Sequence, residues 1–176
     1  MKHSVAYLVV FVVLLFANLG HADTRDFDQQ MESVLEVYLE IPKTLAADRI
    51  DGVVATAKTV ATLAENLDSA KVTGMHAKHY KNIPANIKAS TEKLAAAKDI
   101  TAMREALKDL SKPMALWATL SQPQGVSVMY CSMAPGSWLQ INDTVIANPY
   151  YGAKMLRCGE IVGGKGVSAS TLPKNE

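Results

Sequence analysis

Apolar residues recur at three- and four-residue spacing in four stretches of the chain, which is the pattern of helices with one buried face. These stretches cover approximately residues 27–45, 50–67, 82–98 and 100–117. Charged and polar residues occupy the positions between the apolar ones. Because the connections are short, the pattern predicts a mainly α fold with an antiparallel four-helix bundle over about residues 25–121.

Prolines and capping residues set the expected limits of these helices. Pro42 should kink the first helix, and Pro113 should bend or shorten the fourth, because proline lacks the N–H that an inner helical position donates. Asn82, which closely precedes a proline, suits the start of the third helix. Asp99 or Thr101 can cap the start of the fourth helix.

After residue 125 the chain becomes poor in charge. Between residues 126 and 163 the charged residues are Asp143, Lys154, Arg157 and Glu160. Turn-forming residues divide this part, and residues 125–128 and 144–146 have the composition of short strands. A solvated linker would carry more charge, so we expect a loop-and-hairpin element over about 126–162 that packs on the bundle. A flexible tail is expected over 164–176.

The first 22 residues have the pattern of a secretory signal peptide. Lys2 precedes an apolar run over residues 5–17, and Gly20 and Ala22 are the small residues of a cleavage site. The apolar run would span about 20 Å as a helix, short of a hydrocarbon core of about 30 Å, which disfavours an uncleaved anchor. We therefore expect cleavage near Ala22, a periplasmic location and no membrane segment in the single mature domain, residues 23–163.

The charge balance excludes some classes of partner. The chain has 18 Lys and Arg residues against 17 Asp and Glu residues, with no long basic run. A binding partner with a strongly negative surface, such as a nucleic acid or an anionic membrane, is therefore not expected.

Both cysteines lie in the charge-poor segment, and each has a methionine close by. Cys131 is two residues before Met133, and Met155 is three residues before Cys158. The first spacing puts both sulfurs on one side of an extended strand, and the second puts both on one face of a helical turn. A chain reversal at residues 148–152 would bring the four sulfurs together. Thiolates and thioethers are soft donors, so this set points to Cu(I) or Ag(I) as the bound ion.

A disulfide between the cysteines is the alternative reading of the same residues. Two cysteines in an exported chain commonly pair. Cys131 and Cys158 bound a stretch of 28 residues. On the chain-entropy estimate, closing it would stabilise the fold by about 3 to 4 kcal/mol. Met133 and Met155 would then simply fill gaps in the core.

Three further residues are secondary candidates for the metal site. His76 and His79 are three positions apart and can face the same way. Trp138 lies near the sulfurs in sequence and could cover a monovalent cation with its indole face. Surface exposure for the histidines and core packing for the tryptophan are the competing interpretations. No phosphate-binding loop, nucleophile elbow or zinc-protease motif occurs, so we expect no enzymatic activity.

The charge-poor segment resembles a bacterial domain family of unknown function. The resemblance is carried by Met129–Ala134 (MYCSMA), Ser137–Leu139 (SWL), Ile146–Gly152 (IANPYYG) and Lys154–Glu160 (KMLRCGE). The family pattern is Tyr/His-Cys-Pro-Met-Ala, Gly-Ala-x-Trp-Leu, Asn-Pro-Tyr-Phe/Tyr-Gly and Met-Leu-x-Cys-Gly. Ser132 replaces the usual proline here, and the stretch after Ala134 is shorter than in the family, which puts the geometry of that loop in question.

That family includes small exported proteins, and its domain is also appended to the C-terminus of some periplasmic adaptor subunits of copper/silver efflux pumps. The resemblance implies a helical domain whose Cys/Met element binds copper or a related heavy metal. It assigns the ligand positions to Cys131, Met133, Met155 and Cys158. A metal-efflux adaptor or a copper chaperone is the implied partner.

Two hypotheses follow from the sequence. The first is an exported heavy-metal-binding protein that buffers Cu(I) or Ag(I) or delivers it for efflux. The second is an interaction or scaffold module without a metal, in which a Cys131–Cys158 disulfide staples the loop element to the helices.

Overall fold

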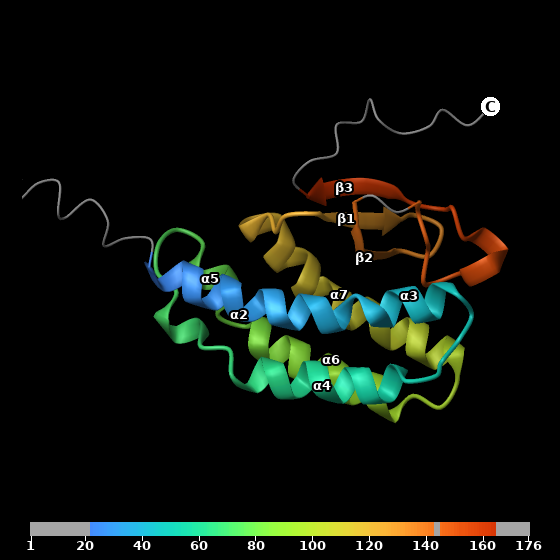
Figure 1. The fold of residues 1–176 in the computed structure, drawn as a ribbon, viewed down its shortest axis with the longest axis horizontal. Coiled ribbons are helices and arrows are strands. Elements are labelled where there is room, and N and C mark those ends of the chain that lie inside the picture. Colours follow the sequence, from blue (N-terminus) through green and yellow to red (C-terminus); the bar gives the residue numbers. More distant parts are fainter. Residues whose placement is uncertain (1–21, 143–144, 165–176) are drawn as a thin grey trace, which may run out of the picture.

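The computed structural model describes residues 22–142 and 145–164 (Figure 1). The helices are α2 (Ala22–Tyr38), α3 (Glu40–Ala46), α4 (Val53–Glu65), α5 (Ala77–Tyr80), α6 (Ile83–Ala96) and α7 (Ile100–Ser121). The strands are β1 (Val126–Cys131), β2 (Gly136–Ile141) and β3 (Glu160–Gly164), and the 3₁₀ turns are η1 (Ser69–Lys71) and η2 (Gly152–Met155). Apart from Ala22, the expected signal peptide lies outside the described residues. The expected tail also lies outside them, except for Gly164, which is the last residue of β3 and not part of a tail.

The four helical stretches expected from the sequence are present as α2 with α3, α4, α6 and α7. The first is divided at Leu39, so that α2 ends at Tyr38 and α3 begins at Glu40. Pro42 explains the division, because it has no N–H to donate to the carbonyl of Tyr38 four residues earlier. The expected kink is therefore present as a break between two helices.

The later helices begin where the capping residues predict. The Asp99 carboxylate accepts a 2.9 Å hydrogen bond from the N–H of Ala102 and caps α7. Asn82 is the N-cap of α6, although its side chain makes no capping hydrogen bond. Pro113 lies inside α7, which continues to Ser121, so of the two effects expected of this proline, a bend or a shorter helix, the shorter helix is wrong.

A three-stranded antiparallel sheet follows α7, in the order β2-β1-β3. The strand expected from residue 125 is confirmed as β1, and it forms a hairpin with β2, where Cys131 pairs with Gly136. The strand expected at 144–146 is wrong: residues 145 and 146 are irregular, and residue 144 lies outside the described part. The Gln140 side chain holds this stretch near β2 instead, donating to the carbonyl of Val145 and accepting from the N–H of Ala147.

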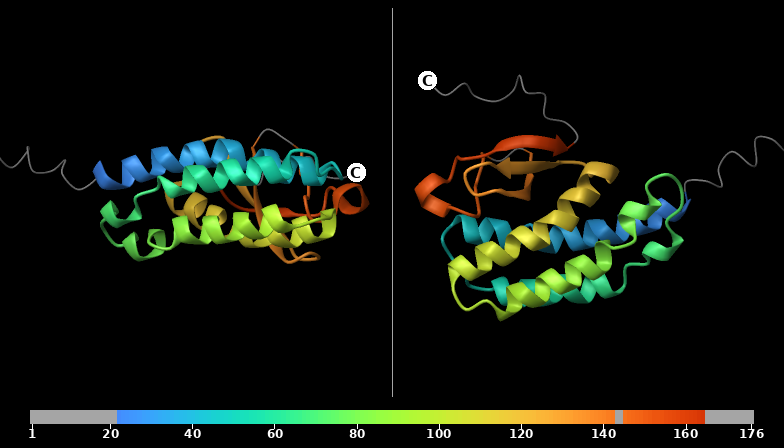
Figure 2. Two further views of the ribbon diagram at one scale, coloured as in Figure 1. Left: turned by 90° about the horizontal axis from the view of Figure 1, so that it is seen from below. Right: turned by 180° about the vertical axis from the view of Figure 1, so that it is seen from behind.

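The protein is mainly helical, with the sheet stacked on one side of the helices. In Figures 1 and 2 the sheet lies beside α2, α3 and α7, while α4 and α6 lie on the far side of these helices. The contacts agree, since β2 touches α7 and α3 while α4 packs chiefly on α6. Tyr38 and Trp117 are fully buried. No helix within 22–142 and 145–164 has both the length and the apolar content to cross a membrane.

Candidate functional site

The two cysteines lie side by side in the structure. Cys131 is the last residue of β1 and is fully buried, while Cys158 lies in the turn between η2 and β3 and is partly exposed. Their Sγ atoms are 3.1 Å apart and are not bonded to each other in the structure. Sulfurs from two segments that are separated in the chain thus form one two-sulfur site, one sulfur fixed in the sheet and the other held by a loop.

The turn after Cys131 directs backbone N–H groups at the sulfurs. Hydrogen bonds from the N–H groups of Ala134 and Met133 act to lower the pKa of Cys131, and one from Met133 also acts to lower the pKa of Cys158. Such bonds favour the ionised thiolate because they place positive hydrogen atoms against its charge. The turn is therefore suited to stabilise a thiolate.

The two thiols differ in acidity. Burial raises the pKa of Cys131, but hydrogen bonds from the Cys158 thiol, from the N–H groups of Ala134 and Met133 and from Asn148 outweigh it, so the pKa is lowered. The pKa of Cys158 is raised, chiefly because its thiol hydrogen-bonds to the Cys131 sulfur and also because it is desolvated. Cys131 is therefore the first to ionise, and thiolate is the form that binds metals and attacks disulfides.

The Asn-Pro-Tyr-Tyr-Gly turn holds the Cys158 segment through its first residue, Asn148. Fully buried, the Asn148 amide donates to the carbonyl of Cys158 at 2.7 Å and accepts from the N–H of Tyr150 at 2.8 Å. Its backbone N–H donates to the carbonyl of Leu156 at 2.8 Å. The sequence indicated a turn here but not this role, and the only signal available was asparagine before a proline.

Arg104 and Asp48 anchor this turn to the helices. Arg104 donates to the carbonyls of Pro149 at 2.8 Å and Leu45 at 2.9 Å, and it pairs with Asp48 at 2.5 Å. Asp48 also accepts a 2.9 Å hydrogen bond from the N–H of Ala153. The bond from Ala153 and then the bond from Arg104 lower the pKa of Asp48, so it is ionised in the pair. Sequence reasoning missed both residues, because they are distant in sequence from the segment they hold.

Tyr150 and Trp138 form the packed base of the turn. Their rings meet edge to face with centroids 5.9 Å apart, and both side chains are buried. The Tyr150 hydroxyl donates to the carbonyl of Ser137. Trp138 also limits the approach of the Cys158 loop, because a Cβ on Gly159 would lie 2.6 Å from the indole ring. The structure therefore places Trp138 in the core beside the loop.

The two methionines are close to the cysteines along the chain and have accessible side chains. Met133 is 62% exposed and its carbonyl accepts a hydrogen bond from Tyr151 at 3.0 Å. Met155 ends η2 and is 37% exposed, and its carbonyl accepts a 3.0 Å hydrogen bond from the N–H of Cys158. Neither methionine side chain is therefore buried in the core, and neither residue serves to fill a gap there.

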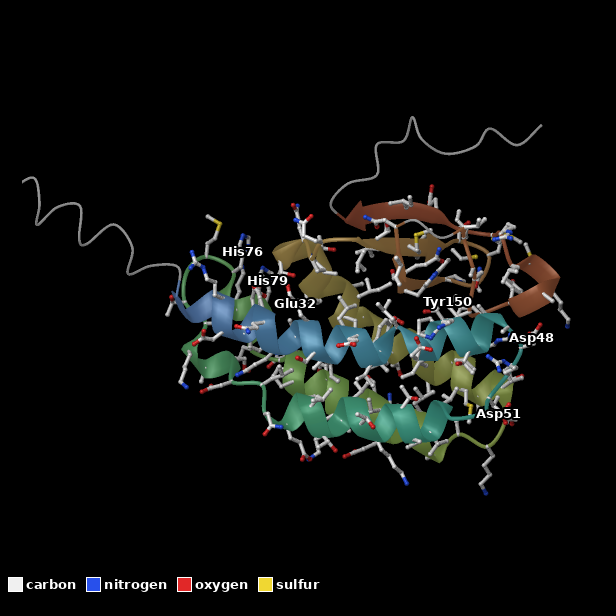
Figure 3. The ribbon with its side chains drawn as sticks, in the orientation of Figure 1. Glu32, Asp48, Asp51, His76, His79 and Tyr150 are labelled. Carbon is white, nitrogen blue, oxygen red and sulfur yellow. The ribbon has the colours of Figure 1, made fainter. Side chains whose placement is uncertain are left out.

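The histidine candidates are far from the sulfurs. His76 and His79 are exposed at α5, with ring centroids 6.2 Å apart, at the opposite end of the helices from Asp48 and Tyr150 (Figure 3). The structure does not bring them to the cysteines. Across residues 22–142 and 145–164, no three His, Cys, Asp or Glu side chains gather as a metal cluster. A metal at the cysteines would thus rely on two thiolates and on thioethers.

A groove of about 800 Å³ runs beside the β1–β2 turn, between α6 and α7. Three of its lining residues are lysines, but each is already paired with an acid: Lys93 and Lys112 with Asp109, and Lys108 with Glu105. The groove therefore carries little free positive charge for an anionic ligand.

Comparison with known proteins identifies a family for the helical part of the chain. The model of the family described as "Protein of unknown function (DUF3347)" matches residues 34–124, which is more than half of the 176 residues. The matched stretch ends just before β1, so the two cysteines and the motifs at 129–160 lie beyond it. No curated protein and no solved structure matches the chain significantly. The chain belongs to the DUF3347 family, a family of proteins of unknown function.

Proposed function

We propose that this protein is an exported carrier of Cu(I) or Ag(I), bound through the thiolates of Cys131 and Cys158 and the thioethers of Met133 and Met155. The observation that carries the proposal is the 3.1 Å approach of the two cysteine sulfurs at the end of β1. Two thiolates with nearby thioethers form a donor set that suits soft monovalent ions and is poor for Mg²⁺ or Ca²⁺.

The surrounding residues support metal binding in the proposed site. The N–H groups of Met133 and Ala134 would offset the negative charge of the thiolates, as outer hydrogen bonds do in metal sites. Burial of Cys131 would protect one ligand from solvent, while the exposure of Met133 would leave one side open for a metal to enter. The four helical stretches, read as an antiparallel four-helix bundle, would serve as the rigid support of this element.

The proposed role is buffering of the ion or its delivery to an efflux system in the periplasm. The signal-peptide pattern supports export, and the four motifs that resemble the Cys/Met family support a metal-efflux adaptor or a copper chaperone as the partner. Partly exposed ligands suit transfer, because a partner's sulfur can displace them one at a time. A carrier of this kind needs no catalytic residues.

A structural disulfide is the second candidate, and the same distance favours it. Sulfurs in a disulfide are about 2.05 Å apart, so a small shift of the Cys158 loop would close the bond. The protein would then be an interaction or scaffold module. Thiol state and Cu(I) affinity separate the two functions, because the oxidised pair has no thiolate to offer a metal.

The test is Cu(I) competition with a coloured chelator, using full-length protein exported by a bacterial host and then reduced. We expect about one Cu(I) per chain, and loss of tight binding in Cys131→Ser and Cys158→Ser. Met133→Leu and Met155→Leu roughly conserve side-chain volume, and we expect each to weaken binding about tenfold with little change in stability.

Met75→Leu is the matched control, because Met75 is 82% exposed beside His76 at the far end of the helices. It should leave the affinity unchanged. If the reduced wild-type protein fails to take Cu(I) from the chelator, and its thiols are fully oxidised when it is isolated, the metal function is refuted and the disulfide module is supported.

A further inference from the structure

Asn148 is a fully buried polar side chain outside the proposed ligand set, and its hydrogen bonds link the Cys158 segment to the turn at residues 148–152. Its amide donates to the carbonyl of Cys158 at 2.7 Å, and a hydrogen bond from the same side chain is one of the causes that lower the pKa of Cys131. A primary amide has two N–H donors, which is the number needed to reach both partners. The side chain thus bridges the two halves of the site.

The other end of Asn148 is fixed to the turn that the helices anchor. Its side-chain oxygen accepts from the N–H of Tyr150 at 2.8 Å, and its carbonyl accepts from the N–H of Gly152 at 3.1 Å. Arg104 in turn binds the carbonyl of the next residue, Pro149, at 2.8 Å. A continuous chain of hydrogen bonds therefore runs from α7 through Asn148 to Cys158.

We infer that Asn148 is the positioning residue of the two-sulfur site, holding the Cys158 loop against the end of β1 and keeping the sulfurs within bonding reach of one another or of one metal ion. The inference that Asn148 positions the ligands of Cu(I) or Ag(I) rests on the proposed function. The inference that Asn148 keeps the two sulfurs close together does not depend on any metal.

A glutathione equilibrium measures sulfur proximity without metal. In this reaction the protein dithiol and one glutathione disulfide exchange to give the protein disulfide and two glutathione thiols, so two electrons and two protons pass to glutathione. The equilibrium constant reports the effective concentration of one protein thiol at the other. Looser positioning lowers that concentration and raises the reduction potential of the pair.

Two variants remove the bridge and keep the turn. Asn148→Asp retains the oxygen that binds the N–H of Tyr150 but has no amide donor, and it puts a carboxylate beside the Cys158 carbonyl. Asn148→Ser also keeps an oxygen suited to a local turn and adds no charge, so it remains informative if the aspartate variant does not fold. For both variants we expect the effective concentration of one thiol at the other to fall at least tenfold. This corresponds to a rise of about 30 mV in the reduction potential of the cysteine pair.

The same variants should weaken Cu(I) binding at least about tenfold, as is usual for residues that orient metal ligands. Ile87→Val is the control, since Ile87 is fully buried in α6, which packs on α4 and α7. It should lower stability and leave both the potential and the Cu(I) affinity unchanged. This separates positioning from a general loosening of the fold.

A potential within about 10 mV of wild type in both Asn148 variants, or an equal shift in Ile87→Val, would overturn the inference. If the variants shift the potential while wild-type protein takes up no Cu(I), the positioning role stands and the proposed metal function fails.

Discussion

Replacing Gly152 with alanine should loosen the turn that carries Asn148. Gly152 has φ of +58°, a left-handed conformation that L residues rarely adopt. A Cβ at this position would lie 2.0 Å from the Asp48 carboxylate oxygen and 2.5 Å from the Arg104 guanidinium. Both distances are far inside van der Waals contact, so the side chains of the anchoring pair would have to move apart.

The expected cost combines backbone strain and lost hydrogen bonds. A left-handed alanine costs about 1–2 kcal/mol. Moving Arg104, whose side chain is 15% exposed, weakens its bonds to the carbonyls of Pro149 and Leu45. A hydrogen bond from a charged donor contributes about 1.5–3 kcal/mol, and hydrogen bonds to water replace part of this contribution when the bond is lost. We therefore expect Gly152→Ala to lower the free energy of unfolding by about 3 kcal/mol, which in a domain of this size lowers Tm by about 6–12 °C.

The assay is urea or thermal unfolding followed by circular dichroism, with Gly74→Ala as the matched control. Gly74 also has positive φ, +91°, but a Cβ there meets nothing within 4 Å. Gly74→Ala should therefore lower the free energy of unfolding only by the backbone strain, about 1–2 kcal/mol. If Gly152→Ala costs no more than Gly74→Ala, the argument from close approach to Asp48 and Arg104 is wrong.

Two further predictions concern polar groups that hydrogen-bond between helices. Tyr38→Phe removes the 2.7 Å bond between the Tyr38 hydroxyl and Ser111, and it should cost about 1–2 kcal/mol in urea unfolding; a loss under about 0.3 kcal/mol would contradict this. Burial raises the pKa of Asp28, despite hydrogen bonds from Trp117 and Tyr80 that lower it. The folded state then holds its proton more tightly than the unfolded state, so this group makes stability fall as pH rises from its ordinary value of 3.8 through the raised pKa. Asp28→Asn should remove that fall in pH-dependent unfolding curves, and an unchanged pH profile would refute it.

The helices could be predicted because their information is local. Apolar spacing, Asp99 as a cap and Pro42 as an interruption act within one or two turns of chain, and each has the predicted position in the structure. Pro113 does not shorten α7, which continues past it. The packing of α7 on α6 and on β2 stabilises the helix beyond the lost hydrogen bond.

The sheet was only partly predictable because strand pairing is long-range. The beginning of β1 was recognised, but β2 was missed, and the glycines of β3 resemble a tail. The pairing of β3 with β1 joins residues 160–164 to residues 127–130. No local pattern in the sequence indicates which strand β3 pairs with, so only the tertiary structure specifies this pairing.

The sequence by itself determined the kind of chemistry open to this protein: two thiols and two nearby thioethers in a charge-poor segment attached to amphipathic helices. The tertiary structure decided which of these groups meet. It brings the Cys131 and Cys158 sulfurs to 3.1 Å, leaves His76 and His79 at the opposite end, and makes Asn148 and Arg104 part of the support. The physical reason is that convergence depends on chain reversals held by hydrogen bonds between residues far apart in sequence, whereas donor chemistry is a property of each side chain alone.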